Sequence, residues 1–134
     1  MTSAARAAEV THYNDGPLAG LGLPFSESVR VGDLLFLSGT VGSGEGDQLV
    51  PGGIAAEADQ VLRNIQAALQ RRGLDMGNVV KCTVFLADIA EWGQFNEVYK
   101  RYFKAPYPAR SALGASGLAL GARTEVECIA AYPD

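Results

Sequence analysis

Residues 54–86 read IAAEADQVLRNIQAALQRRGLDMGNVVKCTVFL, and this stretch decides the fold. Across residues 54–72 the apolar side chains recur at steps of three and four, which predicts an amphipathic helix. Gly73 follows two arginines and is typical of a helix end. Residues 79–86 are rich in β-branched and aromatic side chains, which predicts a largely buried strand. The stretch therefore predicts a helix packed against a sheet.

Upstream of this helix, the sequence predicts three short strands. Residues 10–13 form the first of them. Residues 28–31 and 34–38 form a hairpin, because the Gly-Asp pair between them suits a tight turn. The intervening segments, 14–24 and 39–53, are rich in glycine and proline and are predicted to be loops.

Downstream, a second helix is predicted over residues 89–103, with Asp88 as its cap and prolines at 106 and 108 ending it. Strands are predicted over residues 110–115 and 124–132. In the last strand, alternation divides the side chains between two faces. One face carries Val126, Cys128 and Ala130, and the other carries Glu125, Glu127 and Ile129.

This order of elements predicts an α+β protein with one mixed β-sheet and both helices packed on one face. The other face of the sheet carries many small and apolar residues. A single layer of helices cannot cover both faces, so we expect the chain to associate with copies of itself.

Composition limits the classes of protein to which the chain can belong. Its 134 residues fit a single domain, 1–134, in which residues 1–8 are predicted to be a flexible tail. Hydrophobic residues make up 48% and the formal net charge is −4, which indicates a globular protein and argues against nucleic acid as the main partner. No apolar run approaches the roughly 20 residues that span a membrane, and no apolar signal segment is visible. We therefore expect a cytoplasmic protein.

The two cysteines, Cys82 and Cys128, each lie within an apolar run. Buried free thiols are the simplest interpretation. A disulfide is possible, although no spacing pattern supports one. With a single histidine, His12, and no CxxC motif, the chain offers almost no ligands for a metal, and we predict no metal site.

The stretch Tyr107-Pro108-Ala109-Arg110-Ser111 carries the most informative candidate residue. Pro108 restricts the backbone at the entry to the strand and so fixes the direction of Arg110. The planar guanidinium of an arginine matches a carboxylate through two parallel hydrogen bonds. Arg110 is therefore a candidate for holding a small carboxylate. The alternative is a surface arginine, or one paired with a glutamate of the last strand.

Two further groups of residues could contribute to a site. Glu125 and Glu127 lie on the same face of one strand, about 7 Å apart, and paired carboxylates can perform acid/base chemistry. The commoner alternative is two solvated glutamates. Gly39, between Ser38 and Thr40, would let a ligand approach backbone amides, although it is equally a simple end to a strand.

Together these residues resemble a known family. Pro108-Ala109-Arg110-Ser111, with Glu125-Val126-Glu127 further on, is similar to the C-terminal signature of the reactive intermediate deaminase family, RidA/YjgF, also called the endoribonuclease L-PSP family. The segments that also resemble the family are residues 37–39 (LSG), 73–74 (GL), 79–86 (VVKCTVFL) and 95–103 (FNEVYKRYF). The resemblance spans roughly residues 24–131.

The resemblance implies a fold like that of the small trimeric chorismate mutase. It also implies a homotrimer with clefts at the subunit interfaces. Many family members hydrolyse 2-imino or 2-enamino acids to 2-keto acids and ammonia, without a metal or a cofactor. A ribonuclease or translation-inhibitor activity is also known in the family, but the acidic charge of this chain makes it the least favoured reading.

Site residues follow from the same resemblance. Arg110 would clamp the substrate carboxylate, and Glu125 would hold or activate the attacking water. Asn96 would line the cleft. Backbone contacts would come from Gly39, which follows the strand-end Ser38, and from Ala112.

Three positions depart from the family pattern. Ala112 replaces a frequent cysteine, Phe25 replaces the usual tyrosine, and Thr124 replaces an aliphatic residue. The loss of the hydroxyl and the thiol favours an alternative function, a non-catalytic binder or sensor of small carboxylates. For an enzyme, Phe25 and Ala112 would suit a substrate with a larger or more apolar side chain.

Overall fold

The computed structural model describes residues 6–134, and residues 1–5 lie outside the described range. Of the tail predicted over residues 1–8, residues 6–8 are exposed and have no regular secondary structure.

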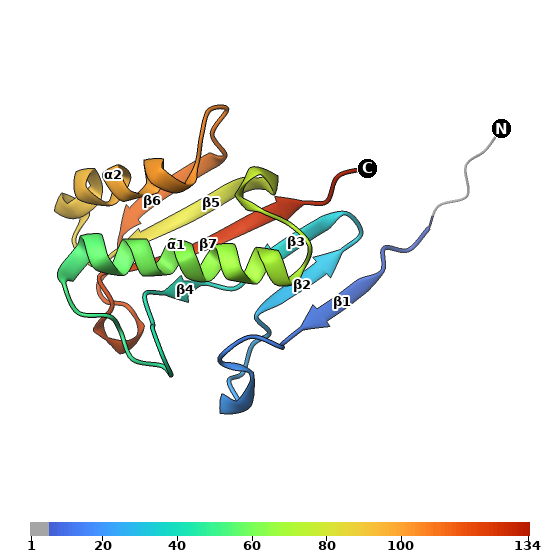
Figure 1. The fold of residues 1–134 in the computed structure, drawn as a ribbon, viewed down its shortest axis with the longest axis horizontal. Coiled ribbons are helices and arrows are strands. Elements are labelled where there is room, and N and C mark those ends of the chain that lie inside the picture. Colours follow the sequence, from blue (N-terminus) through green and yellow to red (C-terminus); the bar gives the residue numbers. More distant parts are fainter. Residues whose placement is uncertain (1–5) are drawn as a thin grey trace.

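One mixed sheet forms the centre of the described chain (Figure 1). Its strands are β1 (Val10–Tyr13), β2 (Ser28–Val31), β3 (Leu34–Leu37), β4 (Thr40–Val41), β5 (Val79–Leu86), β6 (Ala109–Gly114) and β7 (Thr124–Ala131). The spatial order is β1-β2-β3-β7-β5-β6, and β4 also pairs with β7. The pair β5 and β6 is parallel, whereas the other pairs are antiparallel. A parallel pair needs a crossover connection, which here contains the second helix.

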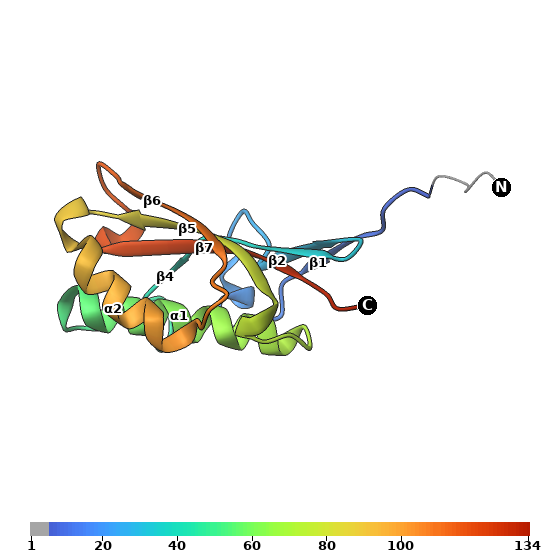
Figure 2. The same ribbon diagram turned by 90° about the horizontal axis from the view of Figure 1, so that it is seen from above.

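Both helices, α1 (Gly53–Arg71) and α2 (Trp92–Tyr102), lie on the same face of the sheet (Figure 2). The stripe predicted for the first helix is buried at Ala58, Val61, Leu62, Ile65 and Leu69. It packs with the inward residues of β5 and β7 in a single core. The predicted α+β architecture is therefore confirmed.

Two elements differ from the prediction. The short strand β4 lies inside the segment predicted to be a loop, because its pairing with β7 is a long-range contact that a two-residue pattern cannot signal. The predicted second helix is divided into a 3₁₀ turn, Ile89–Glu91, and α2. As predicted, Asp88 caps the start of this region, where its side chain accepts a hydrogen bond from the amide of Ala90 (2.9 Å).

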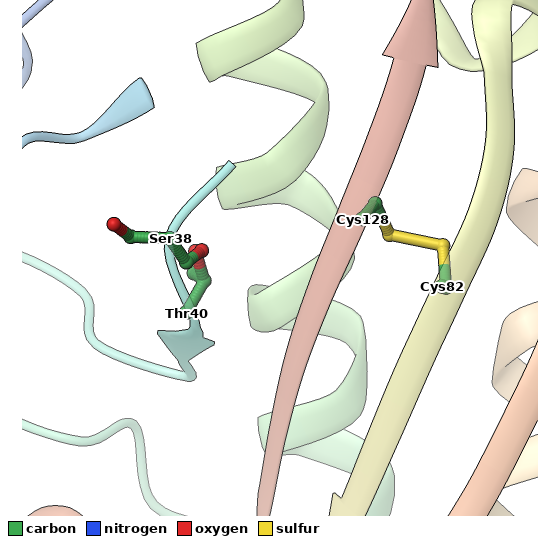
Figure 3. The surroundings of a disulfide bond; sticks show 4 residues. All are labelled: Ser38, Thr40, Cys82 and Cys128. Carbon is green, nitrogen blue, oxygen red and sulfur yellow. A yellow bond between two sulfur atoms is a disulfide. The ribbon is translucent and has the colours of Figure 1, made fainter. Parts of the chain in front are cut away.

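The preference for free thiols is wrong, because the structure joins Cys82 and Cys128 in a disulfide (Figure 3). The two residues are direct cross-strand partners in β5 and β7, and both are buried. The sequence offered no spacing pattern because the pairing depends on the register of two strands 46 residues apart.

The second face of the sheet is not covered by either helix (Figure 2). Strand alternation places Phe36, Phe85 and Ile129 on this face, together with Leu113 of the edge strand β6. Phe36 and Leu113 remain 41% and 42% exposed. Among residues 6–134, neither helix combines the length and the apolar character needed to cross a membrane.

We expect reduction of the disulfide to destabilise the fold. Closing a 46-residue loop removes conformational entropy from the unfolded chain, worth at most about 4 kcal/mol in free energy of unfolding. The measurement is the midpoint of urea unfolding with and without a phosphine reductant, and the variant Cys82→Ala should be insensitive to the reductant. Equal midpoints for the wild-type protein, or two titratable thiols in the unreduced unfolded chain, would contradict the disulfide.

Candidate functional site

Four of the predicted site residues line one pocket of about 350 Å³: Phe25, Ser38, Gly39 and Glu125. They come from three parts of the chain. Phe25 belongs to the loop before β2, Ser38 and Gly39 follow the end of β3, and Glu125 is carried by β7 opposite Val41 of β4. The structure thus brings these four residues together around one pocket.

Gly39 allows the Glu125 carboxylate to lie against the backbone. A Cβ atom at this position would come within 3.1 Å of the carboxyl carbon of Glu125 and 3.2 Å of Oε2. The preceding residue is fixed, because Ser38 Oγ donates to the carbonyl oxygen of Ser26 (2.6 Å) and its amide donates to that of Glu27 (3.0 Å). The carboxylate thus faces the pocket at the end of a well-anchored strand.

The arginine that lines this pocket, Arg71, is already neutralised by a carboxylate of the same chain. Arg71, at the end of α1, forms a bidentate ion pair with Glu27, in which Nη2 and Oε2 are 2.6 Å apart. The neighbouring Arg72 pairs with Asp15 and lies over the ring of Tyr13, 4.0 Å from its centroid. Both ion pairs connect the ends of the 14–27 segment to α1. Within the described chain, the pocket therefore offers a carboxylate but no unpaired cation.

Arg110 lies elsewhere, on the edge strand β6. It is in register with the buried Cys82, so its side chain points to the helix face of the sheet. Its guanidinium carbon lies 4.8 Å from the ring centroid of Tyr99 and about 6 Å from those of Trp92 (5.9 Å) and Phe95 (6.0 Å). Cation–π attraction can hold the guanidinium there without neutralising its charge. Among residues 6–134, Arg110 forms no ion pair, so the expected alternative of a pair with Glu125 or Glu127 does not occur.

Two buried polar atoms of α2 accompany this arginine. The hydroxyl of Tyr99 and Oδ1 of Asn96 have no hydrogen-bond partner in the described chain. Burial raises the pKa of Tyr99, while the charge of Arg110 acts in the opposite direction. Asn96 shares the helix face of Trp92, Phe95 and Tyr99 through its spacing. Because buried polar groups are normally hydrogen-bonded, this face is suited to a polar group from a ligand or a second chain.

One chain does not bring Arg110 and Glu125 together. Cys82 and Phe85 are three residues apart on β5, so their side chains lie on opposite faces of the sheet. Arg110 is paired with Cys82, and Glu125 is paired with Phe85. Their strands are also separated by β5, which puts about 10 Å between the backbones. Ala112 lies on the face of Arg110, opposite Val84.

The chain is similar in sequence and in fold to known proteins. A family model described as "Endoribonuclease L-PSP" matches residues 21–132. The 2-iminobutanoate/2-iminopropanoate deaminase of Mus musculus is 45% identical over 108 residues, covering 80% of each chain. The crystal structure of the yeast protein YEO7 superposes with a TM-score of 0.86, at 37% identity, over 93% of this chain and all of that one. The crystal structure of RidA from the Antarctic bacterium Psychrobacter sp. PAMC 21119 superposes with a TM-score of 0.78, at 34% identity, over 82% of this chain and 89% of that one.

The chain belongs to the endoribonuclease L-PSP family. The resemblance to the RidA/YjgF family is thereby confirmed, as is the chorismate mutase-like fold. For this family member, the sequence did not identify Tyr99 or Trp92 as site residues. Nothing in the local sequence pattern shows that Arg110 lies over their rings.

Glu127 and His12 belong neither to the pocket beside Glu125 nor to the group of residues around Arg110. Glu127 is exposed on the uncovered face, two residues beyond Glu125, and His12 is exposed in β1. Within residues 6–134, no group of three or more histidine, cysteine, aspartate or glutamate side chains could hold a metal ion.

Two glycine substitutions test the packing around Glu125. Gly39→Ala should change the free energy of unfolding by less than about 1 kcal/mol, because only the mobile end of a side chain must move. Gly42→Ala should cost about 1–3 kcal/mol, because its Cβ would lie 2.8 Å from the main-chain oxygen of Glu57. Urea unfolding of both variants measures the difference. Equal losses of stability would refute this account of Gly39.

Proposed function

We propose that this chain is a hydrolytic deaminase that converts 2-imino and 2-enamino acids to 2-keto acids and ammonia, in clefts formed between subunits. One observation carries the proposal. Within the described chain, the guanidinium of Arg110 and the carboxylate of Glu125 form no ion pair; they lie on opposite faces of the sheet, and Glu125 lines the pocket. The mouse relative is named for this reaction on 2-iminobutanoate and 2-iminopropanoate.

The chemistry requires little more than positioning. The carbon of a protonated imine is already electrophilic, so water adds to it while the C=N electron pair moves to nitrogen. Glu125 takes the proton from the attacking water. Once that proton has passed to nitrogen, the C–N bond breaks while the new hydroxyl gives its proton to Glu125. The keto acid remains, and ammonia leaves with that proton as ammonium. Arg110 holds the substrate carboxylate through a two-pronged contact, and fixing substrate and water together can lower such a barrier by up to about 7–11 kcal/mol.

The other residues have supporting roles in this proposal. Asn96 and Tyr99 offer hydrogen bonds beside Arg110, where their buried polar atoms have no partner in the described chain. Ser38 and Gly39 present backbone groups next to Glu125, and Ala112 does so beside Arg110. Phe25 forms part of the pocket wall. The reaction requires neither a metal nor a cofactor.

A homotrimer is part of the proposal. Arg110 of one subunit would face Glu125 of its neighbour, which a closed ring allows at every interface. The uncovered apolar face, with Phe36 and Leu113 exposed, supplies surface for that contact. We also propose the cytoplasm as the location, because unstable imines have to be hydrolysed close to the enzymes that release them.

A sensor of small carboxylates is the second candidate. Phe25 and Ala112 supply neither the hydroxyl nor the thiol that the family pattern usually has at these positions. A site that only binds a keto acid would need Arg110 but not Glu125. A nuclease is disfavoured by the net charge of −4.

The roles of Arg110 and Glu125 are tested by substitution. A 2-imino acid is generated in situ by an amino acid oxidase, and keto acid release is followed with and without the protein. We expect Arg110→Lys to lower kcat/KM about 10- to 100-fold, because lysine lacks the two-pronged fork. Glu125→Gln should lower kcat about 100-fold or more while keto acid binding persists, since a general base typically contributes that much. Full activity in Arg110→Lys would refute the mechanism, and a wild-type protein that binds keto acids without accelerating hydrolysis would favour the sensor.

Mixing the two variants tests whether the cleft lies between subunits. Arg110→Ala and Glu125→Gln should each be inactive alone. After unfolding and refolding together in equal amounts, about a quarter of the clefts in a cyclic trimer would combine an intact arginine with an intact glutamate. Activity should recover to that extent. Restoration absent from a mixture shown to contain mixed trimers would place both residues in the same chain.

A further inference from the structure

We propose that the pocket beside Glu125 is the binding site for the substrate side chain, and that it selects 2-imino acids with branched or aromatic side chains over those with one or two side-chain carbons. This inference rests on the proposed deaminase function and specifies its substrate class. The pocket, of about 350 Å³, falls within the range of roughly 300–1,000 Å³ found for drug-sized ligands. It has room to spare beyond a three- or four-carbon acid.

Several polar side chains of the pocket are already hydrogen-bonded or paired within the chain, which leaves fewer groups to recognise a polar side chain. Asn64 donates to the carbonyl oxygens of Val41 (3.2 Å) and Ser43 (2.9 Å), and its Oδ1 accepts from Gln60 (2.8 Å). The Ser38 hydroxyl is used by Ser26, and Arg71 is paired with Glu27. Asn14, Ser43 and Asp47 also line the pocket, but most of its wall is apolar and includes Leu18, Leu21, Leu23, Phe25, Ala67 and Leu120.

Several of these apolar side chains remain accessible. Leu21 is 52% exposed, Phe25 51% and Leu120 60%. Large apolar groups left open around a concave surface indicate a place where apolar area is to be buried. The segment that carries Leu21 and Leu23 is held to α1 at both ends, through the pairs of Asp15 with Arg72 and of Glu27 with Arg71. The wall is therefore formed before a ligand arrives.

Geometry at the reacting carbon directs the side chain into this wall. Glu125 must lie close to C2 to deliver water, and the carboxylate attached to C2 is held by the arginine of the neighbouring subunit. The side chain begins at the next bond from C2. Because the Glu125 carboxylate would repel the anionic end of the substrate, the apolar end is the part that fits beside it. Phe25 extends the apolar wall without a hydroxyl.

The test compares imines made in situ from alanine, 2-aminobutanoate, leucine and phenylalanine. Each methylene buried in the pocket should raise kcat/KM about fourfold, so the leucine-derived imine should exceed the alanine-derived one by roughly tenfold or more. A ratio of one or less in an active enzyme would overturn the pocket assignment while leaving the deaminase function intact.

Substitutions in the pocket wall test whether these side chains cause the preference for larger substrates. Leu21→Ser and Leu23→Ser should each reduce the leucine-to-alanine ratio of kcat/KM several-fold. Val10→Ser is the matched control, because Val10 is equally exposed (54%) but does not line the pocket, and it should leave the ratio unchanged. A ratio that falls equally in all three variants would refute the assignment.

If the protein does not hydrolyse these imines, the binding of keto acids tests the same side-chain preference. Calorimetry with pyruvate and 4-methyl-2-oxopentanoate measures the same preference without catalysis. Tighter binding of the six-carbon acid, weakened in Leu21→Ser, would support the pocket even for a sensor, whereas equal affinities would show that it is filled by another part of the assembly.

Discussion

Alternation of side chains across β5, β6 and β7 is the constraint on which the site depends. Successive residues of a strand must point to opposite faces, so Arg110, in register with Cys82, cannot share a face with Glu125, in register with Phe85. A single chain thus displays an acid and a base that it cannot combine. That separation is why the proposed chemistry calls for a second copy of the chain.

The two half-sites differ in how their charges are maintained. Arg110 lies over aromatic rings that cannot neutralise its charge, beside polar atoms of Asn96 and Tyr99 that have no hydrogen-bond partner among residues 6–134. Glu125 lies against Gly39, where the absence of a side chain gives the carboxylate room. The pocket's own arginine, Arg71, is occupied by Glu27. We therefore expect Arg110 to bind the carboxylate of an anionic ligand, and the pocket to receive the apolar end of the same ligand.

The disulfide between Cys82 and Cys128 connects the same central strands that position both half-sites (Figure 3). It lies in the core beneath the helices, between β5 and β7, which are paired from Val79 to Leu86 of β5. Because Cys82 is also the register partner of Arg110, the covalent connection lies one strand from the proposed carboxylate clamp. The register of β6 with β5 fixes the face of the sheet to which the arginine points.

The sequence by itself determined the helices, most strands and the identity of the candidate residues, because these follow from local periodicity and from short motifs such as that around Arg110. It also determined which residues of β7 share a face. Only the tertiary structure decided the disulfide, the strand β4, the aromatic support of Arg110 and the division of the site into two parts. Each of these depends on strand register and on contacts between distant segments, for which a single sequence carries no local signal.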